Sequence, residues 1–329
     1  MRNFKSLWML IICLFATSGL SAQDKYSFTV SQDGKGDFTS VQKAIDACKA
    51  FPDQRVTIHV KNGTYKEKIV VPSCNTRLSI IGESRDSTII TFDDYFGRIN
   101  RGRNSTFFTY TMKIEANDFI LENVTVENSA GQVGQAVALH VEGDRCLFLN
   151  CRFLGNQDTI YLAGQFSRQY FRDCYIEGTT DFIFGEATVL FEHCDLFCKI
   201  NSFLTAASTP EGKPFGFVFI GCKVTAAKGV DKACLGRPWR GFARVAYLNC
   251  DLGSCIRPEG WDNWSKKENE KTARFAEFNN TGTSLSGRAA WSVQLTGKEA
   301  AGYTRENILK SVNWELSARK NWFDPDSGK

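Results

Sequence analysis

Short alternating segments of apolar and polar residues follow one another along most of the chain and predict an all-β fold. Up to residue 92, the pattern predicts strands at 26–30, 56–60, 68–71, 78–81 and 87–92, separated by Gly, Asn and Asp. Alternation with a period of two is typical of strands with one buried face. No periodic segment of helix length separates the strands from residue 56 onward, so the open choices are a sandwich, a barrel or a solenoid.

Six later segments share one sequence pattern, and their spacing distinguishes among these three folds. Each has an apolar or aromatic lead, a polar residue or Gly, then Cys or Val, any residue, and another apolar residue. The Cys or Val positions are separated by 27, 23, 20, 28 and 28 residues, and they are Val124, Cys151, Cys174, Cys194, Cys222 and Cys250. Strand-like units with this period predict a single-stranded parallel β-helix, a solenoid whose coils stack like residues on one another. The five cysteines are expected to form an interior ladder with steps of about 4.8 Å.

Two further segments are predicted to cover the solenoid. Residues 41–51 place apolar side chains on one face at helical spacing, with Ser40 as N-cap and Pro52 as the stop. This helix is expected to close the N-terminal end, because an exposed strand edge must be covered. From about Trp261 the repeat is lost, and a helix is expected at 305–312 with Thr304 as its cap. The C-terminal tail should pack along the flank or cover the other end.

Residues 1–22 have the pattern of a secretory signal peptide. Arg2 and Lys5 precede an apolar run, and small residues lead to Ala22, where cleavage is expected. The run is shorter than the roughly 20 residues of a spanning helix, although an uncleaved anchor remains the alternative. No other spanning segment follows it. We expect an exported protein that is secreted, periplasmic or held at the cell surface, with residues 23–329 as a single domain.

The net charge and the cysteine content limit which partners and how many disulfides we expect for the exported part. The formal charge is +4, and it becomes +2 (+4 − 2) without Arg2 and Lys5. So mild a charge does not favour nucleic acid binding, although a locally basic cleft for an acidic polymer remains allowed. One of the 12 cysteines lies in the signal, which leaves 11 (12 − 1) and no Cys-x-x-Cys pair. We expect at most a few disulfides and at least one free thiol, with buried unpaired cysteines as the alternative.

Two aspartates fall at the same place on neighbouring coils. Asp158 and Asp181 each follow a cysteine of the ladder by seven residues, so their carboxylates are expected to stack, 23 residues apart in sequence. Gln135 and Gln157 are 22 residues apart and add an amide column beside them. The solenoid should therefore carry a patch of two amides and two carboxylates on one outer face.

Paired carboxylates beside a cation suit nucleophilic and acid–base chemistry. Two carboxylates within about 5–6 Å do not both ionise easily, so the pKa of one rises. Arg237, in a turn made by Gly236 and Pro238, is the cation expected to select which one stays charged. The patch then offers a carboxylate nucleophile, a protonated acid and amide donors for an oxyanion. A purely structural role for the aspartates, with Arg237 as an ion-pair partner, remains equally open at this point.

Serine chemistry is disfavoured. The chain has no Gly-x-Ser-x-Gly motif, and its three histidines, His59, His140 and His193, lack a matching Ser. This leaves the carboxylates as the candidates for catalysis.

Four segments resemble the signature blocks of the pectin methylesterase family. They are Gly-Gln-Ala-Val-Ala-Leu at 134–139, Asn-Gln-Asp-Thr-Ile-Tyr at 156–161, Gly-Thr-Thr-Asp-Phe-Ile-Phe-Gly at 178–185 and Leu-Gly-Arg-Pro-Trp at 235–239. They occur in the family's order and at its approximate spacing, and the four together are highly specific. Segments at 33–38 and 260–261 also match, so the resemblance covers about residues 26–290.

The resemblance implies a right-handed parallel β-helix that hydrolyses methyl esters of galacturonate in pectin, without a metal or other cofactor. Asp181 matches the nucleophile, and Asp158 matches the acid that protonates methanol and then the base that activates water. Gln157 and Gln135 match the amides that stabilise the oxyanion. Arg237 matches the residue that orients Asp181 and keeps it ionised.

The resemblance also implies contacts with the substrate. Trp239 matches a wall that contacts sugar, and Thr106 falls where the family has a substrate-contacting Thr. Tyr161 and Trp261 are expected as further cleft aromatics, with packing in the core or at the rim as the alternative.

Some positions depart from the family or vary within it. Cys174 and Cys194 match a pair that some relatives bridge. His140 replaces an Arg common in plant relatives, and Gly134 replaces a larger residue before the Gln; both bear on substrate contacts and neither on the chemistry. The tail beyond about residue 300 is not covered by the resemblance.

Two other functions remain as alternatives. A lyase or polygalacturonase on the same fold needs calcium-binding acidic clusters or paired aspartates in other motifs, which the sequence does not contain. A non-catalytic carbohydrate-binding solenoid would keep the fold without turnover. The favoured hypothesis is a monomeric esterase whose partner is methyl-esterified pectin (homogalacturonan), with no nucleic acid partner.

Overall fold

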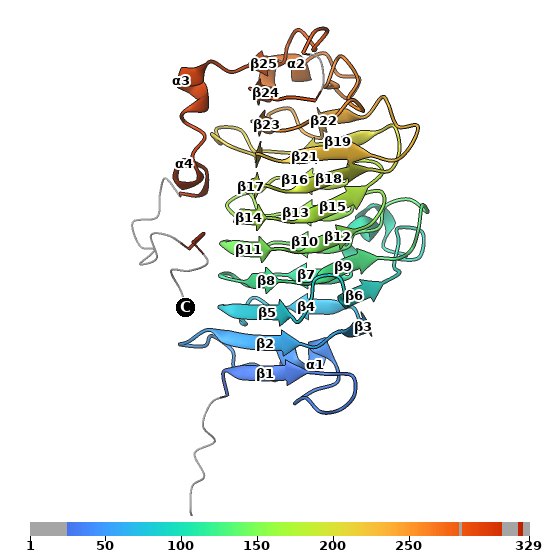
Figure 1. Cartoon of the computed structure of the whole chain (residues 1–329), viewed down its shortest axis with the longest axis vertical. Coiled ribbons are helices and arrows are strands. Elements are labelled where there is room, and N and C mark those ends of the chain that lie inside the picture. Colours follow the sequence, from blue (N-terminus) through green and yellow to red (C-terminus); the bar gives the residue numbers. More distant parts are fainter. Residues whose placement is uncertain (1–24, 283–284, 311–321, 325–329) are drawn as a thin grey trace, which may run out of the picture.

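Three parallel sheets run along the chain, and each full coil adds one strand to each of them (Figure 1). The computed structural model describes residues 25–282, 285–310 and 322–324. The predicted signal peptide at 1–22 lies outside these residues. Among the described residues, no helix is long and apolar enough to cross a bilayer. The predicted parallel β-helix is confirmed.

The first sheet has eleven strands in chain order along the solenoid. They are β1 (Ser27–Val30), β2 (Val56–Val60), β5 (Leu78–Gly82), β8 (Ile120–Glu122), β11 (Cys146–Leu149), β14 (Arg168–Arg172), β17 (Thr188–Glu192), β20 (Phe217–Ile220), β23 (Arg244–Leu248), β24 (Arg274–Phe278) and β25 (Val293–Gln294). This sheet contains the repeated segments that the sequence shows.

The second and third sheets have seven strands each. The second sheet contains β4 (Ile69–Val71), β7 (Met112–Ile114), β10 (Leu139–Val141), β13 (Ile160–Leu162), β16 (Ile183–Gly185), β19 (Phe203–Ala207) and β22 (Cys234–Pro238). The third sheet contains β3 (Gly63–Lys66), β6 (Thr88–Phe92), β9 (Thr125–Asn128), β12 (Arg152–Leu154), β15 (Tyr175–Gly178), β18 (Asp195–Cys198) and β21 (Lys223–Ala226). The predicted strands of the N-terminal coils agree with the structure within one residue at each end, but β3 was missed.

The polar residue or Gly before each ladder position is a corner of the coil. The residues at this position have φ between 49° and 61°, and they are Asn123, Asn150, Asp173, His193, Gly221 and Asn249. This left-handed conformation favours Gly, Asn and Asp, which explains the composition of the position. Corner side chains also pair between coils: the Asn150 amide donates to the Asn123 oxygen at 2.7 Å.

Stacked side chains fill the interior. The predicted cysteine ladder is confirmed, because all five of its members are at most 1% exposed. Beside it, rings of successive coils stack with centroids 4.3–4.9 Å apart, in the order Phe148, Phe171, Phe191, Phe219 and Tyr247. All eleven cysteines between residues 48 and 255 are unpaired, so Cys174 and Cys194 are not bridged and act as small apolar residues.

The N-terminal end is covered by the predicted helix, in a shorter form. Helix α1 (Val41–Asp46) begins at the Ser40 cap, whose side chain accepts from the backbone of Lys43, and it packs against β1, β2 and β4. The prediction that it continues to residue 51 was wrong. The helix ends at Asp46, and Phe51, with φ 48°, lies outside the right-handed helical region that a residue before proline avoids.

The C-terminal part extends the solenoid farther than predicted. Strands β24 and β25 continue the first sheet beyond Trp261, so the loss of the repeat there does not mark the end of the coils. Helix α2 (Asn269–Thr272) precedes β24, and helices α3 (Gly297–Ala300) and α4 (Arg305–Leu309) follow β25. A 3-10 helix, η1 (Gly102–Phe108), lies earlier in the chain.

The tail packs along the flank, as one of the two predicted arrangements has it. Helices α3 and α4 lie beside the first sheet (Figure 1), and Ile308, Leu309 and Phe323 bury against its outer apolar side chains, among them Tyr170 and Leu190. The Thr304 side chain caps α4 as predicted. The helix ends at Leu309, and the last residues of the predicted helix, 311–312, lie outside the described residues.

Candidate active site

The outer face of the second sheet forms the floor of the site. Strand register aligns one outward residue from each of six neighbouring strands, in the order Lys113, His140, Tyr161, Phe184, Ala206 and Arg237. The candidate carboxylates, Asp158 and Asp181, lie two residues before β13 and β16. A single face therefore brings together a cation, aromatic rings and both aspartates.

Asp158 and Asp181 occupy equivalent positions on adjacent coils, as predicted. The Asp158 N–H donates to the carbonyl of Thr180 at 3.0 Å, and the Asp181 N–H donates to the carbonyl of Phe203 at 2.8 Å. Both aspartates are in the left-handed region, with φ 63° and 50°. They are only 9% and 6% exposed, so both carboxyl groups are largely removed from water.

Arg237 holds Asp181 with two hydrogen bonds. Its Nε donates to Oδ1 at 3.0 Å and its Nη2 donates to Oδ2 at 2.6 Å. This fork-to-fork geometry is the strongest that arginine makes with a carboxylate. It fixes the plane of the Asp181 carboxylate and places a full positive charge beside it.

The two carboxyl groups differ in protonation. Burial raises the pKa of Asp158 well above its usual value, the negative charge of Asp181 adds to this, and Arg237 only partly opposes it. Burial also raises the pKa of Asp181, but there the hydrogen bonds and charge of Arg237 act against it. Asp181 is therefore the first of the pair to lose its proton, and Asp158 holds its proton beside the charged Asp181.

Gln135 and Gln157 form the expected amide column. The two residues pair as a parallel bridge on adjacent coils, and the backbone N–H of Ala136 donates to the Gln157 carbonyl at 3.1 Å. Both side chains are half-buried. Neither side-chain amide hydrogen-bonds another group of the described residues, so both N–H donors are free for a ligand.

Comparison with known proteins identifies the family. The family model named Pectinesterase matches residues 27–312. The chain belongs to the pectinesterase family. The match extends beyond residue 300, so it includes part of the tail that the sequence motifs did not cover.

Relatives and solved structures agree with this assignment. The chain is 40% identical over 290 residues to Pectinesterase 31 of Arabidopsis thaliana, covering 85% of this chain and 91% of that protein. It spans about half the length of several other curated relatives that it matches. The pectin methylesterase from carrot superposes with a TM-score of 0.81 at 30% identity, over 88% of this chain and 94% of that one. A pectin methylesterase in complex with a hexasaccharide gives a TM-score of 0.78 at 29% identity, over 88% and 98%.

This pectinesterase is a carboxylic ester hydrolase with pectin methylesterase activity. The aspartate pair, its arginine and the two amides are the groups in the described residues that suit such chemistry. No three His, Cys, Asp or Glu side chains gather to hold a metal ion anywhere in the parts that the structure describes.

Of the three aromatic residues predicted to line the cleft of the pectinesterase, Tyr161 and Trp239 lie at its surface, whereas Trp261 does not. Tyr161 and Trp239 are half-buried on the second sheet, where Phe184 lies between them, with ring centroids 4.7 and 5.9 Å away. Thr106 lies in η1 and is 8% exposed. The neighbouring Phe107 ring packs 4.9 Å from Tyr161, so η1 borders the same aromatic surface.

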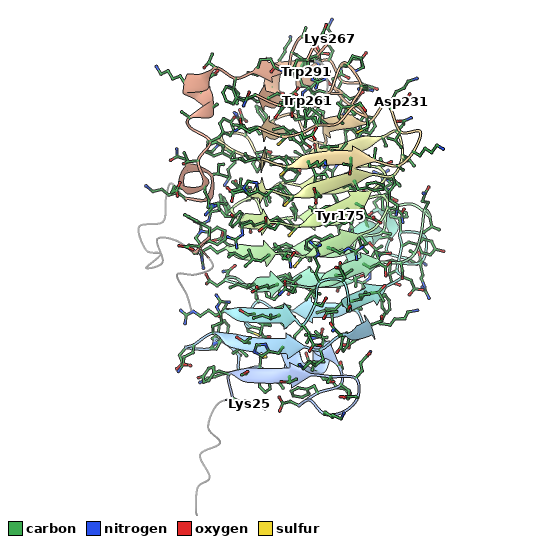
Figure 2. The ribbon with its side chains drawn as sticks, viewed as in Figure 1. Lys25, Tyr175, Asp231, Trp261, Lys267 and Trp291 are labelled. Carbon is green, nitrogen blue, oxygen red and sulfur yellow. The ribbon has the colours of Figure 1, made fainter. Side chains whose placement is uncertain are left out.

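Trp261 does not line the cleft, and that prediction was wrong. Its side chain is 2% exposed inside the last coils (Figure 2), where its ring packs 4.6 Å from Phe275. The indole N–H donates to Glu277 at 3.0 Å, and Arg288 donates to the same carboxylate at 2.8 Å. Trp261 is therefore a core residue whose polar atom is satisfied by a buried ion pair.

Two aromatic residues at the site were not found from the sequence. Phe203 and Trp264 face the guanidinium of Arg237, with ring centroids 4.0 and 3.9 Å from its central carbon. Trp264 stands three residues after Trp261, and the pair of tryptophans was the available signal. The sequence does not show which of the two points inward.

His140 lies on the floor of the site and is buried there. Its ring packs 4.7 Å from Tyr161, and its Nε2 lies 3.0 Å from Glu142. Burial lowers the pKa of His140, so the ring is neutral near pH 7. No serine hydroxyl hydrogen-bonds this ring among the described residues.

Proposed function

We propose that this pectinesterase hydrolyses the methyl esters of galacturonate in homogalacturonan with Asp181 as nucleophile and Asp158 as general acid and base. One observation carries the proposal. Asp181 is held by two hydrogen bonds from Arg237, one coil from an Asp158 whose pKa is raised more strongly. Adjacent carboxyl groups with separated pKa values supply a charged nucleophile and a protonated acid at the same pH.

In the first half of the reaction, the ionised Asp181 attacks the ester carbonyl. The C–O bond to the methoxy group breaks, and Asp158 gives its proton to the departing methanol. The product is an acyl anhydride between Asp181 and the galacturonate. The free N–H groups of Gln157 and Gln135 are suited to stabilise the tetrahedral oxyanion that precedes it.

In the second half, Asp158 is a carboxylate and acts as the base. It takes a proton from water, and the hydroxide attacks the anhydride carbonyl of the galacturonate. Asp181 leaves as a carboxylate that Arg237 again holds, and Asp158 ends protonated. The cycle consumes one ester and one water and releases methanol and a galacturonic acid, which gives its proton to the solvent.

The polymer would lie on the aromatic surface of the second sheet. Tyr161 and Trp239 offer flat apolar faces for sugar rings, and Thr106 lies at the border of that surface in η1. A related pectin methylesterase has been solved with a bound hexasaccharide, which supports a polymeric ligand here. We further propose that the enzyme is exported, on the basis of the signal-like residues 1–22, and that it acts as a monomer.

Methanol release and chain length separate this function from its alternatives. Methyl-esterified pectin incubated with the enzyme is expected to release methanol while the average length of the polymer stays constant, with and without EDTA. Shortened chains would indicate a lyase or a polygalacturonase, and activity lost in EDTA would indicate metal-assisted chemistry. Pectin binding without any methanol would leave a carbohydrate-binding solenoid.

A further inference from the structure

Two aromatic rings pack against the Arg237 guanidinium. The ring centroids of Phe203 and Trp264 lie 4.0 and 3.9 Å from the central carbon of the guanidinium. Phe203 belongs to β19, the strand beside β22, so it is fixed by the sheet. Trp264 comes from the loop between β23 and α2 and is half-buried. The rings shield the guanidinium in part from water, and its Nε and Nη2 are bonded to Asp181.

The loop holds Trp264 in a conformation that bulky residues avoid. Trp264 has φ 59° and Ser265 has φ 54°, both in the left-handed region. The Trp264 N–H donates to Asp262 at 2.7 Å, and Asp262 is paired with Arg257 at 3.3 Å. Backbone strain of this kind persists where the surroundings impose it, and it gathers at functional sites.

The loop is anchored a second time beyond Trp264. The Asn269 amide donates to the Asn263 carbonyl at 3.0 Å, and the Asn263 amide donates to Glu270 at 2.7 Å. These bonds tie the loop to α2. The indole is thus held over Arg237 from both sides of the loop and not by its own packing alone.

We propose that Trp264 is a positioning residue that acts through Arg237, and that with Phe203 it clamps the guanidinium so that Asp181 is held for attack. The proposal rests on the proposed function, because it takes Asp181 as the nucleophile. Without the indole, water reaches one face of the guanidinium, and the side chain gains other rotamers. The two hydrogen bonds to Asp181 are then made only part of the time, so fewer enzyme molecules present the carboxylate correctly.

A wall for the sugar is the competing role for Trp264, and the two roles differ in kinetics. If Trp264 is a wall that contacts the sugar, it contributes to substrate binding, so its loss raises KM whether residue 237 is Arg or Ala. A clamp contributes to the presentation of Asp181, so its loss lowers kcat and needs Arg237. The double-mutant cycle of Trp264→Leu and Arg237→Ala distinguishes them.

The cycle is measured as methanol release at saturating and limiting pectin. Trp264→Leu is expected to lower kcat by roughly tenfold with KM changed less than about twofold, and to change kcat less than about twofold when Arg237 is already Ala. Trp264→Phe keeps a flat ring and should recover most of kcat. Equal effects of Trp264→Leu in both backgrounds, or an effect confined to KM, would overturn the proposal.

A control variant and a measurement of stability test the clamp without relying on the proposed function. Trp291→Leu removes a half-buried indole that packs on Phe275 in the last coils (Figure 2), and it should leave kcat unchanged. The four proteins of the cycle are also unfolded in urea, where Trp264 and Arg237 should show non-additive losses of stability without any substrate. Additive losses of stability would contradict the clamp. A wild type that releases no methanol would instead contradict the esterase mechanism, and the double-mutant cycle measured by urea unfolding would still test the clamp.

Discussion

Replacing Asp181 by Asn is expected to reduce methanol release from methyl-esterified pectin by roughly 10⁴-fold or more, because the amide cannot form the anhydride. Asn is the appropriate replacement since it keeps the volume of Asp and tolerates the φ of 50° at this position. Arg237 would still hold the amide oxygen. The loss should therefore appear in kcat, measured as initial methanol release at saturating pectin.

Asp173→Asn is the matched control for this variant. Asp173 is a coil corner with φ 56°, and it makes a surface ion pair with Arg172 at 3.4 Å. The substitution removes one carboxylate from the same backbone conformation outside the site, so activity should match the wild type. An Asp181→Asn protein that is folded by circular dichroism and keeps more than a tenth of the wild-type rate would rule out the nucleophile assignment.

Asp158→Asn is expected to lower kcat on the order of 10²–10⁴-fold, the range that general acid–base catalysis contributes. The amide can neither protonate the methoxide nor activate water, although Asp181 keeps its partner Arg237. The loss should be smaller than for Asp181→Asn because a nucleophile remains. Substrate binding is tested separately by the retention of the variant on a pectin gel.

The surroundings of Asp158 indicate that Asn at this position leaves the fold intact, so a loss of activity reports on catalysis. Asp158 is 9% exposed and holds its proton beside the ionised Asp181, so Asn replaces an uncharged side chain of the same size and should not destabilise the fold. Near-normal turnover by a folded Asp158→Asn protein would show that another group supplies the proton.

The repeat made most of the fold predictable from the sequence. A left-handed corner favours Gly, Asn or Asp, and the position after it points into the solenoid, so Asn150-Cys151 and Asn249-Cys250 record one geometry in different coils. Counting seven residues from the ladder then put Asp158 and Asp181 on the same face. Spacing was sufficient here because parallel strands in register turn equal offsets in sequence into neighbours in space.

Features that depend on the orientation and contacts of individual side chains could not be predicted from the repeat. The sequence places Trp261 and Trp264 three residues apart, but the inward position is decided by the buried Glu277 that accepts from Trp261. The clamp on Arg237 joins residues 203, 237 and 264, and only the folded coils bring them together. Strands β24 and β25 were missed because they extend the first sheet without a ladder cysteine.

The pH dependence of kcat/KM for the wild type and for Arg237→Ala tests the central claim most directly, namely that a charged Asp181 works beside a protonated Asp158. The reaction needs Asp181 without its proton, so activity falls as the pH drops through the pKa of Asp181. It needs Asp158 with its proton, so activity falls as the pH rises through the raised pKa of Asp158. A bell-shaped profile is expected for the wild type.

Arg237→Ala removes the charge and hydrogen bonds that lower the pKa of Asp181, while burial continues to raise it. The acid limb should therefore move to higher pH, with a larger loss of activity under mildly acidic than under neutral conditions, and the alkaline limb should not move to lower pH. Arg240→Ala removes an exposed cation three residues away and should leave both limbs in place. An acid limb at the same pH in Arg237→Ala and the wild type would contradict the proposed division of labour between the two aspartates.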